Sequence, residues 1–111
     1  MTFDREGPTE QGPAERARLE AVVRGRVQGV GFRYFVADVA TARGIVGWVA
    51  NDADGSVVCV VEGPRSDLDD LLDGLRRGPP AARVDDVETS WTAPTGGFER
   101  FSIRSGAHRG D

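Results

Sequence analysis

The apolar run SVVCVVEG at residues 56–63 constrains the fold of this chain more than any other segment. A strand with one solvent-facing side alternates apolar and polar residues, but residues 57–61 are all apolar. Both faces of such a strand must be covered, so we predict that it lies in the middle of a sheet. The preceding run IVGWVAN and the turn sequence DADG at 52–55 predict a hairpin that contains this strand.

Two segments with helical periodicity lie on either side of the hairpin. The first has these apolar residues on one face: Phe32, Phe35, Val36 and Val39. The second has four leucines at the same kind of spacing: Leu68, Leu71, Leu72 and Leu75. Gly44 is placed to end the first helix, and Ser66 is the predicted N-cap of the second.

Further strands are predicted from Leu19, over Arg83–Thr92 and over Phe98–Ser105, the last two separated by the turn PTGG. The order is therefore strand, helix, strand, strand, helix, strand, with one more strand at the end. This order predicts an α+β fold of the ferredoxin-like split βαβ type, with a largely antiparallel sheet and both helices on one face. Many unrelated functions use this fold, so the function has to be inferred from a site.

We expect one domain, at residues 18–105, between an N-terminal tail (1–17) and a C-terminal tail (106–111). The first tail contains Gly-Pro pairs and scattered charge, and is predicted to be flexible. A chain of 111 residues can bury a single core without disulfides or metals. Its one cysteine, Cys59, lies in the apolar run and is expected to be a buried, unreactive thiol.

Charge and hydropathy exclude several classes of protein. A net charge of −4 argues against a general nucleic-acid binder, because such proteins present clustered positive charge. No apolar run approaches the roughly 20 residues of a membrane span, and the first residues lack the apolar core of a signal peptide. We therefore expect a cytoplasmic monomer that binds neither membrane nor nucleic acid.

The stretch GRVQGVGFR at residues 25–33 joins the first strand to the first helix. Each glycine costs conformational entropy on folding, so we expect another group to approach this main chain closely. Unpaired N–H groups at a helix N-terminus favour an anion, and Arg33 in the first turn can add a two-pronged contact to a phosphate or carboxylate. The alternative is a tight turn with Arg33 in solvent. The Walker and dinucleotide-binding fingerprints do not fit, since the former needs Gly-Lys-Ser/Thr and the latter a glycine where Tyr34 stands.

GRVQGVGFR followed by GIVGWVAN resembles the acylphosphatase family, and the resemblance continues through DGSVVCVVEGP, the leucine-rich second helix and FERFSIR. It covers roughly residues 19–105. The resemblance implies a small enzyme, free of metal and cofactor, that hydrolyses carboxyl–phosphate anhydrides to a carboxylate and phosphate. The sequence departs from the family's pattern at Ala50, where arginine is common in bacterial members, whereas Gly31 occupies a variable position.

The resemblance also implies a set of site residues. Arg33 would bind the phosphoryl group and Asn51 would place the attacking water. The loop that cradles the phosphoryl group would comprise Gln28, Gly29, Val30, Gly31 and Phe32.

Alternatives to these roles remain open at the level of sequence. Asn51 taken alone is typical of a turn residue, and Gln28 could contact the ligand or brace the loop, with bracing favoured. His108, the one histidine, lies in the polar C-terminal tail and is not expected to be catalytic. The alternative function is a non-catalytic anion-binding or regulatory module. The presence of both Arg33 and Asn51 in the sequence favours catalysis, because binding alone needs only the loop and the arginine.

Overall fold

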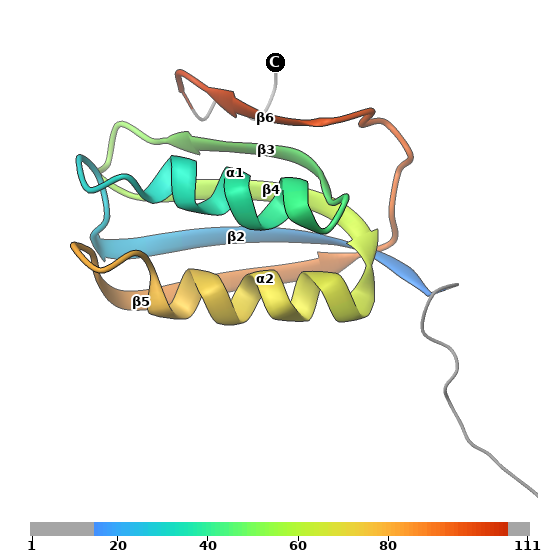
Figure 1. The fold of residues 1–111 in the computed structure, drawn as a ribbon, viewed down its shortest axis with the longest axis horizontal. Coiled ribbons are helices and arrows are strands. Elements are labelled where there is room, and N and C mark those ends of the chain that lie inside the picture. Colours follow the sequence, from blue (N-terminus) through green and yellow to red (C-terminus); the bar gives the residue numbers. More distant parts are fainter. Residues whose placement is uncertain (1–14, 107–111) are drawn as a thin grey trace, which may run out of the picture.

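A computed structural model describes residues 15–106 of the chain. Along this range the strands and helices follow in the predicted order (Figure 1). They are β2 (Arg16–Arg26), α1 (Phe32–Ala42), β3 (Val46–Asn51), β4 (Val57–Pro64), α2 (Arg65–Arg77), β5 (Arg83–Thr92) and β6 (Phe101–Arg104).

The described strands form one sheet in the order β5-β2-β4-β3-β6. The pairs β5–β2, β2–β4 and β4–β3 are antiparallel, and β3–β6 is parallel. Both helices lie side by side across the same face of the sheet (Figure 1). The predicted ferredoxin-like α+β fold is confirmed.

The central strand is β4, as the apolar run predicts. Residues 57–63 are all buried. On the helix side, Val57, Cys59 and Val61 join the main core with the apolar faces of α1 and α2. Burial raises the pKa of the Cys59 thiol to about 12, so this group stays protonated and unreactive.

The other face of the sheet carries a smaller apolar cluster. Trp48, Ala50, Val58 and Val60 are its buried members, and Phe98 packs against them. The guanidinium of Arg104 lies 4.5 Å from the centre of the Trp48 ring, which covers part of that face with a cation–π contact. This cluster explains why β4 is apolar on both sides.

Two predicted boundaries need correction. The domain starts earlier than residue 18, because Arg16 and Ala17 already pair with β4. The last strand is shorter than Phe98–Ser105, because pairing with β3 is confined to Phe101–Arg104 while Phe98 turns to the other face. The positions 1–14 and 107–111 of the predicted tails lie outside the described residues.

The predicted N-cap at Ser66 is also wrong. Helix α2 begins at Arg65, and Pro64 occupies the cap position without a side-chain hydrogen bond. Tertiary contacts favour this earlier start: the Arg65 N–H donates to the carbonyl of Glu15 at 3.0 Å, and its guanidinium lies 3.7 Å from the centre of the Trp91 ring. Contacts with distant segments, not a local capping residue, therefore determine where this helix begins.

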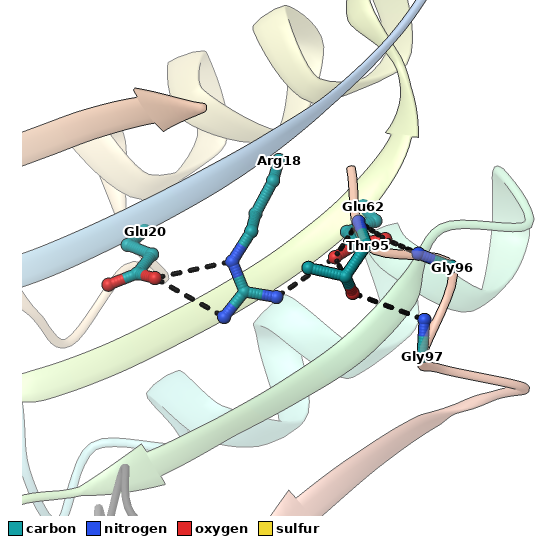
Figure 2. A network of polar contacts seen from close by, with 6 residues as sticks. All are labelled: Arg18, Glu20, Glu62, Thr95, Gly96 and Gly97. Atoms are coloured by element: carbon teal, nitrogen blue, oxygen red, sulfur yellow. Dashed lines mark hydrogen bonds and ion pairs between the residues drawn. The ribbon is translucent and has the colours of Figure 1, made fainter. Parts of the chain in front are cut away.

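Glu62, near the end of β4, holds the segment that connects β5 to β6 (Figure 2). This carboxylate is 2% exposed. It accepts hydrogen bonds from the N–H and hydroxyl of Thr95, from the N–H of Gly96 and from Arg18, at 2.7–3.0 Å. Burial by itself would raise the pKa of Glu62, but the donors of Thr95, Gly96 and Arg18 outweigh it and lower the pKa from 4.5 to about 2.

Candidate functional site

The glycine loop joins the end of β2 to the start of α1. Gly29 and Gly31 are exposed and have φ values of 73° and 80°, a left-handed backbone that other residues rarely adopt. A Cβ atom at either position would meet nothing within 4 Å. Backbone conformation, not crowding, therefore requires glycine at these two positions, and the space beside the main chain is free for a ligand.

Gly25 has a different role from the one predicted. Its φ is 133°, and a Cβ atom there would collide with the backbone of Arg83 in β5. The pairing register of β2 and β5 shifts at the same point, between Arg24 and Gly25. The group that approaches the main chain at Gly25 is thus the neighbouring strand, and the exposed loop begins only after Val27.

Apolar side chains anchor the loop on both sides of its glycines. Val27 and Phe32 are buried, and Val30 packs against the main core. The ring of Phe32 also meets that of Phe35 edge-on, with centroids 6.1 Å apart. The side chains of the predicted loop residues Val30 and Phe32 therefore pack into the core. Only the backbone of these two residues can contribute to a binding loop.

Arg33 lies in the first turn of α1 and is half-buried. Phe35 faces α2, since its ring lies 3.7 Å from the Cβ position of Gly74. Residues two apart on a helix point about 200° apart, so Arg33 lies on the opposite flank of α1, turned away from α2. Helix α1 packs on β3 and β6, and this flank is therefore the one that faces their end of the sheet.

Asn51 is the last residue of β3 and is half-buried. Side chains alternate along a strand, so Asn51 shares the helix-covered face with Val49, which belongs to the main core. The turn at residues 52–55 follows at once. The Asn51 side chain therefore points from the end of β3 toward the helix layer, which contains Arg33.

Gln28 connects the glycine loop to this turn. Its Nε2 donates to the carbonyl oxygens of Asp52 at 2.8 Å and Ser56 at 2.9 Å. The side chain braces the loop, which is the role favoured from the sequence. These two bonds place the loop before α1 directly beside the residues that follow Asn51.

Asp54 and Arg24 also belong to this region, and neither of them was singled out from the sequence. Asp54 accepts hydrogen bonds from the N–H and hydroxyl of Ser56, and Arg24 of β2 donates to it at 3.3 Å. The hydroxyl of Ser56, then its N–H, and Arg24 lower the pKa of Asp54. Asp54 was predicted only as part of the DADG turn, and nothing in the sequence links it to Arg24, thirty positions away.

A hollow of about 410 Å³ lies away from the glycine loop, on the sheet face that the helices leave uncovered. Its lining includes Glu20, Val22, Arg24, Val58 and Glu88. Arg24 and Glu88 already pair with each other at 3.3 Å. The loop remains the better candidate for an anion, because it offers exposed backbone donors and needs no deep cavity.

Within residues 15–106, no three His, Cys, Asp or Glu side chains gather as metal ligands. His108 lies outside this range. The helices that the structure describes are all too short or too polar to cross a membrane.

The sequence matches the acylphosphatase family over residues 19–103. It is 48% identical over 91 residues to an acylphosphatase of Anaeromyxobacter dehalogenans, a match that covers 82% of this chain and 98% of the relative. An acylphosphatase of Pyrobaculum arsenaticum is 47% identical over 90 residues, with 80% and 95% covered.

Among solved structures, the acylphosphatase of Bacillus subtilis is similar with a TM-score of 0.77 and 40% identity; the match covers 79% of this chain and 98% of that one. The family match over residues 19–103 includes the glycine loop and the hairpin that carries Asn51. The chain belongs to the acylphosphatase family of enzymes.

Proposed function

We propose that this chain hydrolyses acyl phosphates at the glycine loop. The backbone from Gln28 to Phe32 receives the phosphoryl group, Arg33 binds its oxygens and Asn51 orients the attacking water. The observation that carries the proposal is the bracing by Gln28, which brings the loop beside the turn after Asn51 through bonds of 2.8 and 2.9 Å.

Arg33 suits the binding of a dianion. Within residues 15–106, no carboxylate forms an ion pair with its guanidinium, whereas Arg18, Arg24 and Arg43 each pair with two. An arginine without a carboxylate partner among these residues can give both prongs of its fork to a ligand.

The reaction requires few catalytic groups from the protein. Water forms a new bond to phosphorus, the bond between phosphorus and the acyl oxygen breaks, and a carboxylate leaves with the bonding electrons. Because a carboxylic acid has a pKa of roughly 4, the leaving group needs no general acid. What remains is to neutralise the phosphoryl charge and align the water, and backbone N–H groups, one arginine and one asparagine suffice for that.

The test is hydrolysis of benzoyl phosphate by the purified chain, with 4-nitrophenyl phosphate as the control. We expect turnover of the acyl phosphate, little of the monoester, and competitive inhibition by inorganic phosphate, which fits the same loop. Turnover is expected to persist in excess EDTA. Phosphate binding without hydrolysis would instead favour the non-catalytic anion-binding module.

Replacing Arg33 with lysine is expected to raise KM and lower kcat together. Lysine keeps the charge but replaces a planar fork with a single ammonium, so contacts to two phosphoryl oxygens are lost. Folding should survive, because Arg33 lies off the buried face of α1.

Arg43→Lys is the matched control for this variant. Arg43 follows the other end of α1 and pairs with Asp67 and Asp70 on α2. It should retain normal kinetics. Normal kinetics in Arg33→Lys as well would remove Arg33 from the site.

A further inference from the structure

A hydrogen-bonded turn at residues 52–56 follows Asn51 directly. The N–H of Asp52 donates to the carbonyl of Ser56 at 2.9 Å, and the N–H of Gly55 donates to the carbonyl of Asp52 at 3.1 Å. Gln28 binds the same two carbonyl groups from the glycine loop. The turn thus links the end of β3 to the glycine loop.

Asp54 fastens this turn from within. Its Oδ1 accepts from the N–H of Ser56 at 2.9 Å and from the Ser56 hydroxyl. Ser56 is only 2% exposed, so its N–H and hydroxyl depend on Asp54 as their partner, and loss of the carboxylate would leave both donors without it. The turn would then lose the contacts that fix its conformation.

Arg24 ties Asp54 to the sheet. Its Nη1 donates to Asp54 Oδ2, and its Nη2 donates to Oε1 of Glu88 on β5, both at 3.3 Å. Arg24 and Asp54 are 47% and 52% exposed, however, and solvent weakens ion pairs of this kind. The bonds to the buried Ser56 therefore contribute more to holding the turn than the bond to Arg24.

We propose that Asp54 is a positioning residue for the hydrolysis: by holding Ser56 it fixes the turn at 52–56, and with it the orientation of Asn51 toward the glycine loop. This inference rests on the proposed function, in which Asn51 orients the water. Asp54 lies outside the loop that receives phosphate. Its removal should therefore change the catalytic step and spare phosphate binding.

Kinetics of three variants test the proposal. Asp54→Ala is expected to lower kcat about tenfold, with KM and inhibition by phosphate changed less than about twofold. Asp54→Asn keeps an oxygen acceptor for Ser56 and loses only the charge that faces Arg24. It should retain kcat within about threefold of the original. Asp85→Ala is the matched control, because Asp85 is 54% exposed and pairs with Arg83 on β5, and it should change nothing.

The same substitution in an Asn51→Ala background shows whether Asp54 acts through Asn51. Asp54→Ala should then cause no further loss of kcat. Normal kcat in Asp54→Ala, an equal loss in Asp54→Asn, or a loss that persists without Asn51 would each overturn the proposal. Rates are compared per folded molecule, below the melting temperature of every variant.

The Asn51→Ala variant alone separates this proposal from the one on which it rests. If its kcat is normal, the role of Asn51 in the proposed function is refuted, and the positioning role of Asp54 fails with it. If its kcat falls while Asp54→Ala turns over normally, only the role of Asp54 is refuted.

Discussion

Replacing Asn51 with alanine is expected to lower kcat by about 10²- to 10³-fold and to leave inhibition by phosphate nearly unchanged. If Arg33 and the loop hold the phosphoryl group while Asn51 orients the water, binding and chemistry depend on different residues. Loss of one positioned polar group in a preorganised site costs about 3 to 4 kcal/mol in the transition state. Turnover, phosphate inhibition and thermal melting are measured on the same preparation.

Asn51→Asp separates a catalytic role from a turn role. Aspartate adopts turn geometry as readily as asparagine, so a residue needed only for the hairpin would tolerate the change. A carboxylate facing the bound phosphoryl group would instead repel it, and both kcat and phosphate affinity should fall. Variants that melt early yet turn over normally would assign Asn51 to the turn alone.

The elements of the fold could be predicted because their signals are local. The apolar run at 57–61 specified a central strand, and the leucine spacing after Ser66 specified the buried face of α2. The order of strands and helices then left few topologies, and the ferredoxin-like one was correct.

The candidate site could be predicted in part, from residues in two short motifs. The glycines at 29 and 31 do lie in an open, left-handed loop, and Gln28 does brace it. The structural reason for Gly25, by contrast, is the backbone of a strand nearly sixty residues later, and no local pattern encodes that contact.

The polar contacts that span the sheet were beyond prediction for the same reason. Arg24 meets Asp54 and Glu88, and Arg18 meets Glu62, across separations of 30 to 64 positions. The position of Glu62 does carry some information. It is an acidic residue directly after a fully apolar stretch of a central strand, and such a residue must be paired if it is buried. The need for a partner could therefore be predicted from the sequence, but Thr95 and Gly96 could not be identified as the partners.

Glu62→Gln is expected to lower the free energy of unfolding by about 3 kcal/mol at pH 7. The carboxylate of Glu62 faces donors only: the N–H and hydroxyl of Thr95, the N–H of Gly96 and the guanidinium of Arg18 (Figure 2). Glutamine keeps the shape but brings its own NH₂ group against those donors and removes the charge. The segment between β5 and β6 loses its attachment to β4.

Glu20→Gln is the matched control. Glu20 binds the same Arg18 at 3.2 Å, but its side chain is 40% exposed, so solvent screens the pair. Its loss should change the free energy of unfolding by less than about 1 kcal/mol. Urea denaturation of both variants at pH 7 measures the difference.

The pH dependence of stability gives a second measure of Glu62. Its pKa in the folded chain is about 2, below the ordinary value of 4.5, so the folded state favours the ionised form. The stabilisation is therefore fully present above pH 4.5 and is lost as the pH falls through about 2. Between these pH values Glu62→Gln should lose less stability than the original chain, because glutamine does not titrate. An unchanged acid slope in Glu62→Gln would show that other carboxyl groups govern acid unfolding and that the bonds to Thr95 and Gly96 contribute little.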